Sequence, residues 1–167
     1  MPNWCENDLR IHGPVGDLKR FTIFAKSYNL QVKDLENDSI LDFNSFVPYP
    51  ERFRELDKIA EQWDGSGRRP KDGYNSGGYE WCRRFWGTKW NACRVSLKRY
   101  KRSLLYKFDT AWSPPTPVIF AMSECFPRLK FSIRFYEGGA GYKGHYILKD
   151  GEFLKCQTGP YCGYRGG

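Results

Sequence analysis

The sequence predicts one α+β domain in which helices pack against an antiparallel sheet. Two observations lead to this fold class. Segments in which apolar and polar residues alternate, which is typical of strands, are interspersed with segments whose apolar residues recur at helical spacing. The 167 residues suffice for one core but are few for two ordinary domains. We therefore expect a single domain over residues 1–158 and a flexible tail over residues 159–167.

Helical periodicity and turn residues define the elements of the first half. A Gly-rich, apolar-poor stretch there is typical of a mobile loop. We regard residues 50–90 as a helical and Gly-rich insertion. The expected elements are a strand over residues 7–12, a helix with Asp17 as N-cap, a strand over residues 40–47, a helix over residues 51–63, the loop over residues 64–78 and a short helix over residues 79–86.

The second half alternates strands with one helix. Thr116 is expected to cap that helix and Pro117 to occupy its first position. The whole order suits a ferredoxin-like arrangement with an added C-terminal hairpin. The expected elements are strands over residues 93–98 and 104–109 joined by a basic hairpin at residues 99–102, a helix that ends at Pro127, a strand over residues 129–136, and a hairpin over residues 142–149 and 152–156.

Several unusual strings occur together in one order. They are PNWCEN at residues 2–7, VPYP at 47–50, WGTKWNA at 86–92, FDTAWSPPTP at 108–117, FP at 126–127 and YE-x-G at 136–139. In this respect the chain resembles the YubB/Api-like family of uncharacterised phage and plasmid proteins with a ferredoxin-like C-terminal domain. The resemblance implies that fold and an origin in a mobile element. It implies no activity.

The positive charge of the chain is concentrated in one segment. The formal net charge is +8, yet residues 83–108 contain nine basic residues and no acidic one. Concentrated charge attracts polyanions, and interleaved aromatic rings can stack on bases. RNA-recognition domains use a ferredoxin-like sheet in this way, although their aromatic sequence pattern is absent here. The alternative is a solvated face that keeps the protein soluble.

We expect an anionic ligand to contact this basic and aromatic segment. Trp86, Trp90 and Trp112 lie among short polar residues, which would suit a small-molecule pocket or, equally, two buried element junctions. The predicted ligand-binding residues are Arg84, Trp86, Lys89, Trp90, Arg94, Lys98, Arg99, Tyr100, Lys101, Arg102, Lys107, Trp112 and Lys143.

A glycine motif, G-x-G-x-x-G, spans residues 139–144. Because it lies between two expected strands, it does not fit a dinucleotide fingerprint. A hairpin or bulge is the simpler interpretation, and a phosphate cradle with Lys143 is the alternative. Cys156 and Cys162 lack a second pair at zinc-binding spacing, so we predict no metal and no cofactor.

The chain has no apolar run long enough to span a membrane, and its N-terminus does not resemble a signal peptide. We therefore expect it to stay in the cytoplasm of the host cell, with its six cysteines as free thiols.

Three functions follow from these patterns. The first is a non-enzymatic protein that binds nucleic acid or an anionic nucleotide. The second is an inhibitor or adaptor that binds a host protein, in particular a component of a defence system. The third is a small enzyme that uses Glu137 and His145, which flank the glycine motif and would have to approach each other. The sequence favours a binding protein over an enzyme, because no nucleophile or metal motif accompanies that pair.

Overall fold

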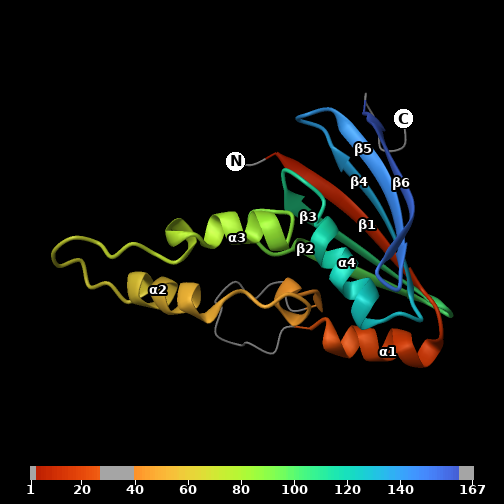
Figure 1. The fold of residues 1–167 in the computed structure, drawn as a ribbon, viewed down its shortest axis with the longest axis horizontal. Coiled ribbons are helices and arrows are strands. Elements are labelled where there is room, and N and C mark those ends of the chain that lie inside the picture. The colour runs from red at the N-terminus through yellow and green to blue at the C-terminus, as the bar shows by residue number, and fades with distance from the viewer. Residues whose placement is uncertain (1–2, 27–39, 162–167) are drawn as a thin grey trace.

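The computed structural model describes residues 3–26 and 40–161. Its elements alternate as the sequence predicts, and the α+β fold is confirmed (Figure 1). They are β1 (Trp4–His12), α1 (Val15–Phe24), the 3-10 helix η2 (Phe43–Ser45), α2 (Glu51–Glu61), the 3-10 helix η3 (Tyr74–Ser76), α3 (Gly78–Phe85), β2 (Cys93–Tyr100), β3 (Ser103–Ala111), α4 (Thr116–Cys125), β4 (Lys130–Glu137), β5 (Tyr142–Lys149) and β6 (Glu152–Pro160).

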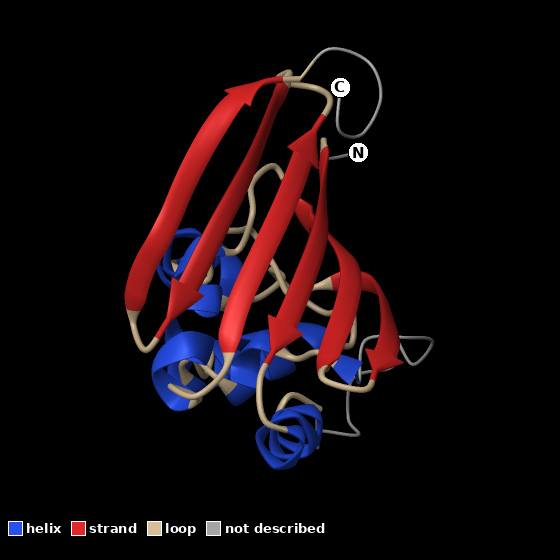
Figure 2. Cartoon of the chain, turned by 90° about the vertical axis from the view of Figure 1, so that its right-hand side faces the viewer, coloured by secondary structure: helices blue, strands red, loops and turns tan. Residues whose placement is uncertain are grey.

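The six strands form one antiparallel sheet in the order β2-β3-β1-β4-β5-β6. The first four of these are arranged as in a ferredoxin-like fold, with β1 between β3 and β4. The C-terminal hairpin of β5 and β6 extends the sheet beyond β4. The helices lie on one side of the sheet, and Figure 2 views the molecule from the side that they leave uncovered. The two helices of the insertion, α2 and α3, project away from the sheet (Figure 1).

Apolar side chains on alternate strand positions form the core between sheet and helices. Phe21 of α1 contacts the rings of Tyr106 on β3 and Phe131 on β4, at centroid distances of 6.0 and 5.7 Å. All three are fully buried. Because strand residues alternate between faces, this inward set fixes which residues point the other way.

The prediction of a strand over residues 40–47 is wrong. This segment carries η2 instead, because nearby side chains satisfy its backbone groups. Asp42 accepts from the backbone N–H of Asn44 at 2.9 Å, and Asn91 accepts from that of Phe43 at 3.0 Å. An apolar run alone does not show which of these bonding patterns forms.

Four expected boundaries also differ. The helix α1 begins at Val15, after Pro14, and Asp17 lies in its first turn, 3.5 Å from Arg20. Similarly, Pro115 precedes α4, and Thr116 makes no capping hydrogen bond. The β2–β3 turn is shorter than expected, since Arg99 and Tyr100 still belong to β2. At the C-terminus, β6 pairs Gly159 and Pro160 with β5, so these two lie in the sheet; residues 162–167 are outside the described residues.

The glycine motif forms a β-hairpin, with Gly141 at φ +71° in its turn. Two of its backbone N–H groups, from Gly139 and Ala140, donate to the buried Glu137 carboxylate. They are therefore not available as a phosphate cradle.

Gly144 of this motif gives a stability prediction. A Cβ there would collide with the ring of Phe135, whereas a Cβ at Gly159 on the neighbouring strand would meet nothing within 4 Å. We expect Gly144→Ala to lower the free energy of unfolding by about 1–3 kcal/mol, as overpacking does. Gly159→Ala serves as the control and should change it by less than about 0.5 kcal/mol. Urea titrations measure both, and equal values would contradict the packing argument.

Candidate functional site

The uncovered face of the sheet, which we call the open face, carries most of the exposed charge of the strands. Cross-strand pairing aligns its side chains in rows; one row runs Lys98, Leu105, Arg10, Ser132, Ile147 and Lys155 across all six strands. The same register places these cations on the open face: Arg10, Arg94, Lys98, Lys107, Lys130, Arg134, Lys143, Lys149 and Lys155. The carboxylates on it are Glu6, Asp8, Asp109 and Glu152.

Two cations of the open face lie against aromatic rings. The guanidinium of Arg94 is 4.4 Å from the centroid of the Trp4 ring, and its Nε is 2.5 Å from Oδ2 of Asp109. The guanidinium of Arg10 is 5.2 Å from the centroid of Tyr100, which is half exposed. Such pairs offer flat surfaces together with positive charge, as stacking of bases requires.

A local irregularity of β2 lies beside Arg94. The register of β2 and β3 shifts between Cys93 and Ser96, and Arg94 has φ +52°. Val95 is buried and Arg94 reaches Asp109 on the open face, as period-two alternation along β2 predicts. The bulge instead changes the position of Cys93, which pairs with Asp109 of the open face and not with an inward residue of β3. Trp4, Glu6, Arg94, Lys107, Phe108 and Asp109 line a cavity of about 320 Å³ there.

Ion pairing leaves much of the charge of the open face available. Lys107 is paired with Asp8 at 3.8 Å, and Arg94 is paired with Asp109. No ion pair to Lys98, Arg134 or Lys155 occurs within the part of the chain that the structure describes. The open face therefore keeps an excess of positive charge across several strands.

A second group of rings and cations lies beside the end of the sheet. Lys89 Nζ is 3.1 Å from the centroid of the Trp112 ring and 5.6 Å from that of Trp90. Trp90 contacts Trp4 edge to face at 6.4 Å. This group consists of Lys89, Trp90 and Trp112. It adjoins the open face through Trp4.

Trp86 does not belong to this group, and the structure corrects its predicted ligand-binding role. It is 5% exposed, and its indole N–H donates to the carbonyl of Val47 at 2.8 Å. Its ring packs against those of Phe43 and Tyr49 at 6.0 and 5.9 Å. A buried ring whose N–H is already bonded offers nothing to a ligand, so the three tryptophans form no common pocket.

The polar residues near those tryptophans are satisfied within the fold. Thr88 donates to the carbonyl of Ala111 and accepts from its N–H. Thr110 donates to the carbonyl of Ser113, whose hydroxyl donates to that of Gly87. Of the two interpretations that the sequence allowed, these contacts support buried element junctions for Trp86, Thr88 and Thr110, whereas Trp112 is exposed.

The remaining predicted residues are divided among other surfaces. Arg99 pairs with the inward-facing Leu104, so it lies at the edge of β2 on the helix side. Lys101 and Arg102 form the exposed β2–β3 turn. Arg84 lies on α3, away from the sheet. The predicted residues on the open face are Arg94, Lys98, Tyr100, Lys107 and Lys143.

The pair Glu137 and His145 is not brought together. Glu137 is 1% exposed and belongs to the inward set of β4, whereas His145 pairs with Arg134 on the open face. Cys5, near Glu137, is no nucleophile either, because burial raises the pKa of its thiol to about 12. The acid–base pair required by the enzyme hypothesis is therefore absent from this hairpin.

The cysteines in the described part of the chain are free thiols, namely Cys5, Cys82, Cys93, Cys125 and Cys156. Cys162 lies outside that part. The described residues contain no group of three His, Cys, Asp or Glu side chains that could hold a metal ion.

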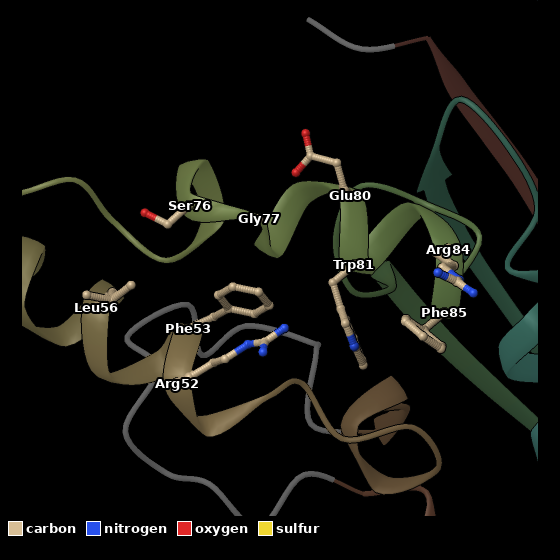
Figure 3. Close-up of a pocket in the computed structure, with 9 residues that line it drawn as sticks. All are labelled: Arg52, Phe53, Leu56, Ser76, Gly77, Glu80, Trp81, Arg84 and Phe85. Carbon is tan, nitrogen blue, oxygen red and sulfur yellow. The ribbon is translucent and has the colours of Figure 1, made fainter.

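Figure 3 shows the pocket between α2 and α3, with a volume of about 580 Å³. Phe53 from α2 and Trp81 and Phe85 from α3 form its rings. Arg52 lies over Phe53 and Arg84 over Phe85, at 4.6 and 5.4 Å. Arg84 is thus the one predicted ligand-binding residue that lines this separate surface.

Sequence reasoning missed half of the open face. Arg10, Lys130, Arg134, Lys149 and Lys155 lie outside the basic segment, and only the sheet brings them beside it. Alternation along residues 129–136 did mark Lys130 and Arg134 as outward-facing. Strict alternation would place Lys155 on the opposite face from Glu152, and the register shift between β5 and β6 brings both to the open face. The sequence did not show that β1, β4, β5 and β6 lie side by side in this order beyond β2 and β3.

Residues 85–162 match the family model described as "Ferredoxin-like domain in Api92-like protein". This segment comprises β2 to β6 and α4, and it excludes β1, α1 and most of the insertion. The crystal structure of the protein api92 from Yersinia pseudotuberculosis is similar to the whole chain, with a TM-score of 0.62 and 12% sequence identity over 99% of this chain and 100% of that one. At this identity the likeness shows the fold alone. No curated protein matches the chain.

The Api92-like match and the sheet order agree on a ferredoxin-like domain. No helix in the described residues is both long and apolar enough to cross a membrane. Neither finding names a ligand, so the argument for function depends on the open face.

Proposed function

We propose that this protein binds single-stranded nucleic acid on the open face of its sheet. The observation that carries the proposal is the combination, on one uncovered surface, of cations from every strand with the ring–guanidinium pairs of Trp4 and Tyr100. Phosphates require distributed positive charge, and bases require flat surfaces for stacking.

A single strand suits this surface better than a duplex does. The face is a sheet with no projecting helix to enter a groove, and its rings can contact only bases that are unstacked from a partner strand. A nucleotide ligand would satisfy one row of the face and leave the others unused. An extended strand can contact several rows at once.

The setting of this function is part of the same proposal. The sequence resemblance to the YubB/Api-like family supports an origin in a phage or plasmid. A role in the host cytoplasm would then expose the protein to nucleic acid of either the element or the host.

Fluorescence anisotropy with labelled oligonucleotides of about 12 nucleotides tests the proposal. We expect binding of single-stranded DNA or RNA that weakens with salt, by roughly fifty-fold between about 50 and 200 mM for about four phosphate contacts. The matching duplex should bind more weakly at each salt concentration. Absence of binding at low salt, or a preference for duplex, would contradict the proposal.

A second candidate function is that of an adaptor that binds a host protein. The pocket of Figure 3 favours it. The exposed ring of Phe85 and the neighbouring Arg84 are features of protein interfaces. Stoichiometric capture of one host protein that survives nuclease treatment, and is lost in Phe85→Ala, would support it. Capture that nuclease treatment abolishes would instead indicate binding through nucleic acid.

A further inference from the structure

The outer half of the open face, formed by β4, β5 and β6, carries a compact polar cluster. Ser132 Oγ and His145 Nε2 share a hydrogen bond of 2.8 Å. Arg134 lies directly opposite His145 on β4. Lys155 on β6 is opposite Ile147 and is therefore a diagonal neighbour of His145. One hydroxyl, one imidazole and two cations thus lie close together on adjacent strands.

Positive charges surround the titratable imidazole of His145 in this cluster. Burial, followed by the charges of Lys155 and Arg134, lowers the pKa of His145 from its usual 6.5. Its direct cross-strand partners are Arg134 and Gln157, and neither is a carboxylate. The other charged groups on this face near His145 are Lys143 and Lys149 on its own strand, Lys130 on β4 and Asp8 beyond Arg134 on β1.

We infer that Ser132, Arg134, His145 and Lys155 form a phosphate-binding subsite for the backbone of the bound strand. When His145 is protonated, its Nε2–H donates to Ser132 Oγ, which leaves the Ser132 hydroxyl proton and the Nδ1–H of His145 to donate to phosphate oxygens. The two cations compensate the negative charge. The inference rests on the proposed function only for the identity of the molecule that supplies the phosphate.

Phosphate binding at this subsite should depend on pH, whereas phosphate binding to the other cations of the open face should not. An anion beside His145 stabilises the imidazolium, so the pKa of His145 is higher in the complex than in the free protein. Between these two values the protein takes up a proton from solvent when it binds. Affinity therefore rises as pH falls through the bound-state pKa, and it levels off below the free-state pKa.

Histidine NMR titrations of the protein test the subsite directly, because the chain has only two histidines, His12 and His145. His12→Gln leaves the resonances of His145 alone in the spectrum. In inorganic phosphate the pKa of His145 should exceed its value in chloride of equal ionic strength. A rise of one unit would correspond to tenfold tighter binding of phosphate to the protonated form. An equal pKa in both salts would overturn the subsite.

Two variants and one further ligand complete the test. Arg134→Gln and Lys155→Gln should each raise the free-state pKa of His145 and reduce the shift that phosphate causes. Adding the single-stranded oligonucleotide separates the two proposals. Binding that leaves the pKa of His145 unchanged overturns the subsite and keeps the proposed function. A phosphate shift without oligonucleotide binding keeps the phosphate site and overturns the proposed function.

Discussion

The triple replacement Arg10→Glu, Lys98→Glu and Lys130→Glu is expected to weaken binding of a single-stranded oligonucleotide by about a hundred-fold at low salt. All three side chains are exposed, and the sheet register places them on the open face. Each replacement removes a cation and adds a repulsive charge. If each contacts one phosphate, the dependence of log K on log salt should also become shallower by about two units.

A matched control separates local contact from overall charge. Lys19→Glu, Lys26→Glu and Lys71→Glu change the net charge by the same amount, at exposed positions in or near α1 and in the insertion loop. Anisotropy titrations should show a much smaller loss for this control, because distant charges affect mainly the rate of encounter. Equal losses in the two triple variants would mean that net charge, and not the open face, determines binding.

The second large effect concerns stability. Trp86→Ala should lower the free energy of unfolding by about 3–5 kcal/mol, since it removes a buried aromatic side chain and leaves a cavity. It also leaves the carbonyl of Val47 without its indole donor. Urea denaturation followed by circular dichroism measures the change.

Trp112→Ala is the natural comparison, because the same residue type is 42% exposed there. Its ring contacts Lys89, and we expect a loss below about 1 kcal/mol. Similar losses for the two variants would show that Trp86 is not the core residue described above.

The fold was predictable from the sequence where a local pattern carried the information. Residues 51–63 show a helical period, and α2 occupies Glu51–Glu61. Residues 129–136 alternate cleanly, and β4 occupies Lys130–Glu137. The strand expected over residues 40–47 failed because its backbone groups bond to the side chains of Asp42 and Asn91. Asn91 is distant in the sequence, so no local window contains this competition.

The sequence by itself determined the order of most elements, the outward-facing positions of a regularly alternating strand such as β4, and the positive charge of residues 83–108. The tertiary structure alone decided which outward-facing residues become neighbours. Pairing of β1 with both β3 and β4 brings Arg10 between Leu105 and Ser132. The same packing buried Trp86 and separated Glu137 from His145. Side-chain direction is a local property of a strand, whereas adjacency depends on hydrogen bonds between segments far apart in the chain.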